Sequence, residues 1–227
     1  MNHLYLIRHG ENLANLTKEF SYKKVDYSLT PKGELQARQT AQYFLDKDID
    51  AIYTSPLKRA YETAGIIAAP LSLHVTVVEN FREVNVGELE GQPPTAALWE
   101  QHNAIIANWI NGHPETAFPG GENLIMLRRR MRAGIEQILA GVDGQSIIIV
   151  GHGGLFWLTL QDLCPQVDMG ALGHENNNGS ITEVLMERDP AGCLSGRLLK
   201  WAAFDHLSGL AAELVSGGPK PGELEKR

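Results

Sequence analysis

The stretch that decides the fold is LYLIRHGENLAN, residues 4–15. An apolar run ends abruptly in Arg8-His9-Gly10-Glu11, which is typical of a buried parallel strand that stops at a functional turn. A second stretch, QSIIIVGHGG at residues 145–154, has the same form and ends in His152. Because ligands gather at the carboxyl ends of strands in open α/β sheets, the two histidines are predicted to face one site.

The rest of the chain alternates between strand and helix patterns. Further strands are expected at residues 51–54, 73–78, 181–186 and 198–204, and the first is expected at 3–7. Helices are expected after the Thr30-Pro31 start signal, over 56–69, and over 121–139. This alternation predicts an α/β fold with a mostly parallel sheet covered on both sides.

Composition limits the class of protein. The chain has 227 residues, 43% of them hydrophobic, and a net charge of −7. The negative charge argues against nucleic acid or an anionic membrane as the main partner. Cys164 and Cys193 are not in metal or redox spacing, and no leader or membrane-spanning stretch is evident. A cytoplasmic protein is expected.

Four features fall at predicted carboxyl ends of strands: Arg8-His9, the 55–59 turn with Arg59, Arg82-Glu83, and Gly151-His152-Gly153. A neutral imidazole can attack phosphorus and form a phosphohistidine. Arginine guanidinium groups can hold the phosphoryl oxygens, and a carboxylic acid can protonate the leaving group. This chemistry needs no metal and no other cofactor.

The motifs come in a recognisable order. They are Arg8-His9-Gly10-Glu11 with Asn15, the stretch 55–60 with Thr63, Arg82-Glu83 followed by Gly87 and Glu90-Gly91, the stretch 119–122, and Gly151-His152-Gly153. From about residue 4 to residue 205 the chain resembles the histidine phosphatase superfamily, the phosphoglycerate-mutase-like proteins. The resemblance implies a three-layer α/β/α sandwich.

The resemblance also implies roles for single residues. His9 is expected to accept the phosphoryl group, Arg8, Arg59 and His152 to form the phosphate pocket, and Glu83 to donate the proton. Contacts to the phosphate are further expected from Asn15, Ser21, the backbone at Gly153 and, on a weaker match, Asn178.

Several assignments have alternatives. Glu88 and Glu90 compete with Glu83 as the acid. Arg128, Arg129, Arg130 and Arg132 are expected on the solvated face of an amphipathic helix.

A single domain is expected over 1–210, with a lid insertion around 88–120 and a loose polar tail over 211–227. Trp99 and Trp109 suit either a lid or a homodimer interface.

The lid bears on the activity. No Lys or Arg lies between Arg82 and Arg128, although Lys23 and Lys24 remain candidates for a second anionic group. The sequence therefore favours a phosphatase of the histidine acid type, acting on a small phosphomonoester whose organic part is neutral or partly apolar. The alternatives are a 2,3-bisphosphoglycerate-dependent phosphoglycerate mutase and a non-catalytic phosphate-binding protein.

Overall fold

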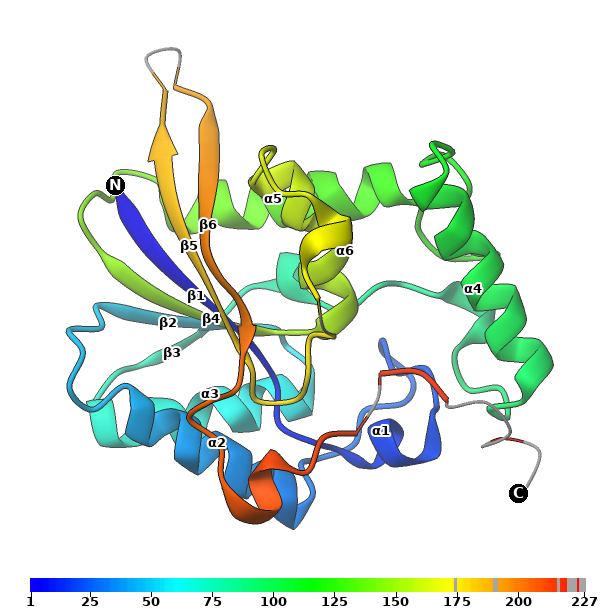
Figure 1. Cartoon of the computed structure of the whole chain (residues 1–227), viewed down its shortest axis with the longest axis horizontal. Coiled ribbons are helices and arrows are strands. Elements are labelled where there is room, and N and C mark those ends of the chain that lie inside the picture. The colour runs from blue at the N-terminus through cyan, green and yellow to red at the C-terminus, as the bar shows by residue number, and fades with distance from the viewer. Residues whose placement is uncertain (174, 190–191, 216, 220–223, 225–227) are drawn as a thin grey trace.

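The computed structural model describes residues 1–173, 175–189, 192–215, 217–219 and 224 (Figure 1). A central six-stranded sheet has the strand order β3-β2-β4-β1-β5-β6. The elements are β1 (Asn2–Arg8), α1 (Leu13–Thr17), α2 (Pro31–Tyr43), β2 (Ala51–Thr54), α3 (Lys58–Leu71), β3 (Val75–Val77), α4 (Ala96–Ile110), α5 (Leu124–Ile138), β4 (Ser146–Gly151), α6 (Gly153–Leu163), β5 (Ile181–Arg188) and β6 (Leu194–Ala203), with short 3₁₀ helices η1 (Glu79–Phe81), η2 (Gly87–Leu89), η3 (Met169–Ala171) and η4 (Gly209–Ala212).

The sheet is mostly parallel, as the sequence predicted. β3, β2, β4 and β1 run in one direction, while β5 and β6 are antiparallel additions at one edge. β1 lies between β4 and β5, and the register pairs Arg8 with Gly151. The next residues along the two strands, His9 and His152, are therefore brought together.

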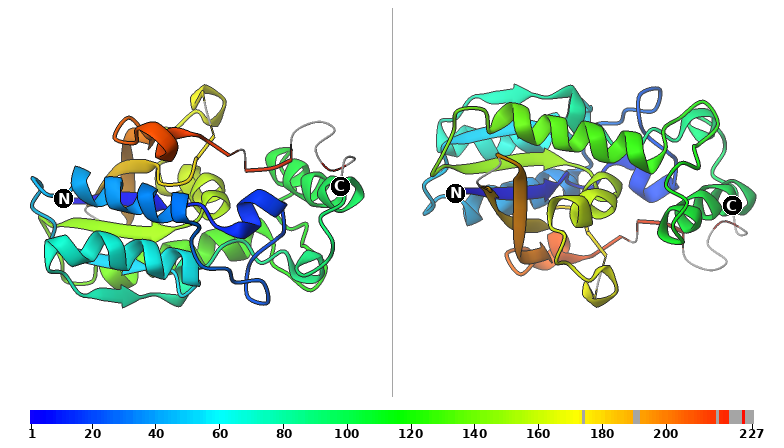
Figure 2. Two further views of the ribbon diagram at one scale, coloured as in Figure 1. Left: turned by 90° about the horizontal axis from the view of Figure 1, so that it is seen from below. Right: turned by 90° about the horizontal axis from the view of Figure 1, so that it is seen from above.

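Helices lie on both faces of the sheet (Figure 2), and alternate residues of β1 belong to opposite core clusters. Leu4 and Leu6 of β1 belong to a buried cluster with α5 and α6. Tyr5 and Ile7 belong to a second cluster with α2 and α3. This alternation is the two-residue period of a strand buried on both faces, and it gives the three layers α/β/α.

The helix starts are explained by local hydrogen bonds. The Thr30 hydroxyl oxygen accepts the N–H of Gly33 at 3.1 Å, and Pro31 opens α2 as predicted. α5 begins at Leu124 rather than at the expected residue 121, because the Asn123 side chain caps it by accepting the N–H of Met126 at 2.9 Å.

The expected lid contains a helix that the sequence patterns did not indicate. α4 stands away from the sheet, to the side of the domain (Figure 1). Trp109 packs edge-on against Phe118 with ring centroids 5.4 Å apart, and Trp99 donates its indole N–H to the carbonyl of Lys18 at 3.0 Å. Trp109 is therefore buried within the expected lid, and Trp99 is partly buried there.

The expectation that the chain is a loose tail from residue 211 onward is wrong for the first residues of that segment. η4 packs on α2, where Gln36 donates to the carbonyl of Ala211 at 3.1 Å and Ala211 is fully buried. Farther along, Gly217 donates its N–H to Glu175 at 3.1 Å. Residues 216, 220–223 and 225–227 of the expected tail lie outside the described residues. Within the described part of the chain, no helix combines the length and apolar character needed to cross a membrane.

Candidate active site

His9 directly follows β1, and its ring is fixed from both sides. Its Nδ1 lies 2.7 Å from the Gly10 carbonyl oxygen, and its Nε2 lies 3.0 Å from Nε of Arg59. A carbonyl only accepts and a guanidinium only donates, so Nδ1 carries the proton and Nε2 keeps its lone pair. Burial, then the charges of Arg59 and Arg8, hold the pKa of His9 well below its ordinary value. The imidazole is neutral.

Arg59, in the first turn of α3, is oriented by Ser21. Its Nη1 donates to the Ser21 hydroxyl and its Nη2 to the Ser21 carbonyl, each at 2.8 Å. Burial lowers the pKa of Arg59 to about 10, so the guanidinium remains charged at neutral pH. Ser21 thus acts on the site through Arg59.

The loop that carries Ser21 is anchored by Glu90. One carboxylate oxygen of Glu90 accepts the backbone N–H groups of residues 22–25 at 2.5 to 3.1 Å. Such a ring of N–H groups is a nest for an anion. Glu90 is therefore a loop anchor, and the competing interpretation of it as the acid loses its support.

Arg8 ends β1 and is buried beside the cavity. Its Nη1 donates to the carbonyl of Asn176, while its Nε has no hydrogen-bond partner among the described residues. A side chain at Gly153 would come within 3.3 Å of this Nε, so glycine keeps the space beside Arg8 open. An unpaired buried donor is costly unless a ligand can use it.

His152 directly follows β4 and is fully buried, with its ring centroid 5.2 Å from that of His9. Its Nε2 lies 2.8 Å from the Ser55 hydroxyl, which also accepts the N–H of Leu57 at 3.3 Å. Its Nδ1 has no partner within the described part of the chain. Burial, then the charge of Arg59, hold the pKa of His152 well below its ordinary value.

Glu83 follows η1 and reaches the first turn of α6. Its Oε1 accepts the N–H groups of Val84 at 2.9 Å and Leu155 at 2.8 Å, whereas its Oε2 accepts, among the described residues, only that of Gly154, at 3.2 Å. Oε2 is therefore the oxygen with room for a proton. The structure brings Glu83 to the same cavity as His9 and leaves Glu88 exposed.

Asn15 and Asn178 lie at different depths relative to the cavity. Asn178 donates to the His9 carbonyl at 3.0 Å and to the Asn15 side-chain oxygen at 3.2 Å. Asn15 lines the cavity, and Asn178 does not. Asn178 therefore supports His9 and Asn15 from behind, and its expected contact with substrate stays a prediction.

Most of the predicted residues surround one cavity of about 560 Å³, although His152 and Asn178 do not line it. Its polar base is made by Arg8, His9, Asn15, Ser21, Arg59, Glu83 and Gly153. Its outer wall is largely apolar and includes Ala14, Phe20, Val84, Val86, Trp99, Ile106, Trp157 and Leu158. His152 lies behind this surface. The cavity also contains residues that sequence reasoning missed, namely Lys18, Glu175 and Asn176.

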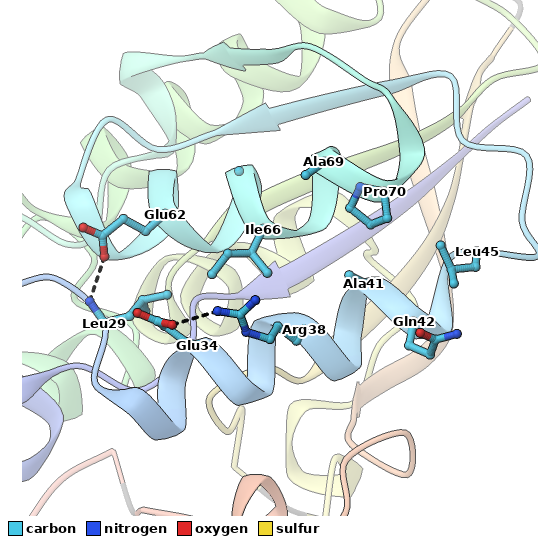
Figure 3. Close-up of a pocket in the computed structure, with 11 residues that line it drawn as sticks. Leu29, Glu34, Arg38, Ala41, Gln42, Leu45, Glu62, Ile66, Ala69 and Pro70 are labelled. Atoms are coloured by element: carbon cyan, nitrogen blue, oxygen red, sulfur yellow. Dashed lines mark hydrogen bonds and ion pairs between the residues drawn. The ribbon is translucent and has the colours of Figure 1, made fainter.

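A second hollow of about 680 Å³ lies between α2 and α3 (Figure 3). Arg38 pairs there with Glu34 at 3.0 Å, and Glu62 accepts the N–H of Leu29 at 2.8 Å. None of the predicted site residues lines this hollow. Among the described residues, no group of three or more His, Cys, Asp or Glu side chains is arranged to hold a metal ion.

The prediction that the arginines of α5 lie on a solvated face is wrong for Arg130 and Arg132. Arg129 is exposed, but Arg132 is bound to the carbonyl of Leu194 at 3.0 Å and pairs with Asp162. Arg130 is bound under the Glu83 segment, where it donates to the Glu83 carbonyl at 2.8 Å.

Comparison with known proteins agrees with this geometry. A sequence model of the histidine phosphatase superfamily (branch 1) matches residues 4–195. The chain belongs to that superfamily. The match covers β1, which His9 directly follows, and it extends through β4 and α6, between which His152 lies.

Named members of the histidine phosphatase superfamily include both activities under consideration. The chain is 34% identical over 190 residues to "Putative phosphoserine phosphatase 2" of Hydrogenobacter thermophilus, covering 82% of this chain and 91% of that protein. It is 34% identical over 171 residues to "Probable phosphoglycerate mutase GpmB" of Yersinia enterocolitica, covering 74% and 79%. A solved Entamoeba histolytica phosphoserine phosphatase mutant in complex with phosphoserine has a TM-score of 0.74 and 25% identity, covering 92% and 100%.

Proposed function

We propose that this protein is a phosphomonoesterase that works through a covalent phosphohistidine on His9. The observation that carries the proposal is the fixed, neutral ring of His9, with Nδ1 bound to Gly10 and Nε2 beside the Arg59 guanidinium. A lone pair next to a permanent cation suits attack on an anionic phosphoryl group. The superfamily membership supports the same reaction.

The reaction has two steps. His9 Nε2 attacks phosphorus and the P–O bond to the organic group breaks, while the departing oxygen takes the proton from Glu83 Oε2. A water molecule then attacks phosphorus, Glu83 accepts a proton from that water, and the P–N bond breaks to release phosphate and neutral His9. Arg8 and Arg59 balance the charge of the phosphoryl oxygens in both steps.

The outer wall of the cavity supports a substrate whose organic part is neutral or partly apolar. α4 contributes Trp99, His102, Asn103 and Ile106 to this wall and no charged side chain. Small phosphomonoesters, among them the phosphoserine bound by a structural neighbour, are the substrate class to test, and inorganic phosphate is the expected product ligand.

One observation favours the mutase as the second candidate. Lys18 lines the cavity together with Arg8 and Arg59, and a third cation suits a substrate with a second anionic group. Lys23 and Lys24, in contrast, are exposed outside the cavity. A relative named as a probable phosphoglycerate mutase gives this candidate further weight.

Two finer features belong to the same proposal. The histidine acid type of phosphatase is supported by the neutral state of His9, which persists below neutral pH. A cytoplasmic location is supported by the thiols of Cys164 and Cys193, which are not joined in a disulfide.

The test is phosphate release from a panel of phosphomonoesters, with 3-phosphoglycerate offered with and without 2,3-bisphosphoglycerate. We expect release from at least one ester, no dependence on EDTA treatment, and loss of turnover in His9→Ala. Conversion of 3-phosphoglycerate to 2-phosphoglycerate without release would establish the mutase instead. Binding of phosphate without either activity would identify a non-catalytic protein.

A further inference from the structure

We propose that Arg130 is a positioning residue for Glu83, fixing the place from which that carboxyl group gives and takes a proton. The inference rests on the proposed function. It starts from the backbone around Glu83, which has no regular secondary structure between η1 and η2. Arg130 Nη1 donates to the carbonyls of Asn80 at 2.8 Å and Arg82 at 2.7 Å, and its Nη2 donates to that of Glu83 at 2.8 Å.

Glu122 completes this arrangement. It binds Nε and Nη2 of Arg130 at 2.9 and 2.7 Å, and it exchanges two hydrogen bonds with the backbone of Asn85, at 2.7 and 3.0 Å. The Arg130–Glu122 pair, which is largely buried, therefore grips the chain on both sides of Glu83.

The carboxyl group is then located by two separate parts of the fold. α5 fixes the main chain of Glu83 through Arg130, and the first turn of α6 fixes its side chain through the N–H groups of Gly154 and Leu155. A planar guanidinium can hold three carbonyls and a carboxylate at once, whereas an ammonium group on a flexible stem cannot reproduce that geometry. Arg130→Lys should therefore keep the positive charge but no longer hold the Glu83 carboxyl group in position.

A misplaced Glu83 has a chemical signature that general loosening of the fold lacks. Proton donation matters most when the leaving oxygen is a poor leaving group, as in an alkyl phosphate, and little when it is a good one, as in p-nitrophenyl phosphate. Loss of placement should therefore slow alkyl esters far more than aryl esters. A loss of phosphate binding or of folded protein should slow both equally.

Arg132 provides a matched control on the same helix. It is also partly buried, and it pairs with Asp162 while donating to the carbonyls of Asp162 at 2.6 Å and Leu194 at 3.0 Å. These contacts tie α5 to α6 and β6 and involve no residue next to Glu83. Arg132→Lys should therefore cost a similar amount of stability without touching the acid.

The experiment compares kcat/KM for p-nitrophenyl phosphate and for the best alkyl phosphate of the panel, in the wild type, Arg130→Lys, Arg132→Lys and Glu83→Gln. We expect Arg130→Lys and Glu83→Gln to lower the rate for the alkyl ester about tenfold or more beyond that for the aryl ester. Arg132→Lys should leave the ratio of the two rates unchanged. Thermal unfolding should give Arg130→Lys and Arg132→Lys similar midpoints.

Equal losses for both esters in Arg130→Lys, or the same change of ratio in Arg132→Lys, would overturn the assignment. If Arg130→Lys does not fold, Glu122→Gln, which keeps the shape of the partner and removes its charge, is measured in the same way and must change the ratio in the same direction. If the wild-type protein hydrolyses no ester, the proposed function itself fails. If the wild type hydrolyses esters but Arg130→Lys slows alkyl and aryl esters equally, only the role of Arg130 fails.

Discussion

Arg59 and His9 are joined by a hydrogen bond in which the guanidinium Nε donates to the imidazole Nε2 at 3.0 Å. The other ring nitrogen is held by the Gly10 carbonyl, so Nε2 is the ring atom left to react. The contact also places a positive charge at the atom that we propose receives the phosphoryl group. In the proposed reaction, the Arg59 Nε donor moves from the ring nitrogen to a phosphoryl oxygen as the substrate enters.

This relationship predicts the atom that is phosphorylated. During turnover the phosphoryl group should be found on Nε2 of His9, because Nδ1 is bound to Gly10 throughout. Rapid quenching in alkali followed by ³¹P NMR of the denatured phosphoprotein distinguishes the two phosphohistidine isomers. His9→Ala should carry no label, and a label on Nδ1 or on another residue would contradict the assignment.

The mostly parallel sheet and the approach of its two histidine-bearing strand ends were accessible from sequence. Arg8-His9 and Gly151-His152 follow apolar runs, and neighbouring parallel strands end at the same edge of a sheet, so their approach could be expected. The apolar stripe of α5 was equally readable, since Leu127, Met131 and Ile135 are fully buried.

The supporting contacts were not accessible in this way. An amphipathic pattern indicates which face of a helix is buried, but not how far a neighbouring segment covers its flank, and η1 and the Glu83 segment cover the flank of Arg130. Glu90 likewise bonds to a loop 65 to 68 positions earlier in the chain. Such pairs depend on how irregular loops meet in space, and periodicity carries no information on that.

Ser55 is expected to determine which ring nitrogen of His152 carries the proton. Because its hydroxyl already accepts the Leu57 N–H, we expect it to give its own proton to Nε2 of His152, so that the ring proton is on Nδ1. Ser55→Ala should lower kcat about tenfold, the value of one buried hydrogen bond of roughly 1.4 kcal/mol. Long-range ¹H–¹⁵N NMR should show a change of ring tautomer or a mixture.

The neighbouring Thr54 supplies the control for this variant. Thr54 is also fully buried, and its hydroxyl donates to backbone carbonyls instead of to His152. Thr54→Val should therefore leave the tautomer of His152 and kcat near their wild-type values. An unchanged tautomer in Ser55→Ala would show that the serine does not control the ring.

Gly10 is expected to be required for stability, because its α-carbon faces backbone. A Cβ at Gly10 would lie 2.4 Å from the carbonyl oxygen of Gly33 in the first turn of α2. Gly10→Ala should therefore lower the free energy of unfolding by about 1–3 kcal/mol, the cost of overpacking. In Gly65→Ala the new methyl group meets nothing within 4 Å. This replacement of a helical glycine should instead raise the free energy of unfolding by about 0.5–1 kcal/mol. Urea unfolding of both variants measures the difference, and equal stabilities would contradict it.

Acid should weaken the fold through histidines that are buried in the neutral form. Burial, the largest cause, lowers the pKa of His206 to about 4, and the pKa values of His9 and His152 are also depressed. An unfolded histidine has a pKa of about 6.5, so the unfolded chain binds more protons than the folded one below that pH. The contribution of these groups is complete above about pH 6.5 and decreases as the pH falls toward each folded pKa.

His206 allows this contribution to be isolated. Its Nε2 lies 3.1 Å from the Thr40 hydroxyl, away from the candidate site, so His206→Gln should leave turnover intact. The free energy of unfolding of His206→Gln, measured in urea from pH 7.5 to pH 4, should fall less steeply below pH 6.5 than that of the wild type. Carboxylates titrate in both proteins and cancel in the comparison. Parallel pH profiles would mean that His206 is already protonated in the folded protein at mildly acidic pH.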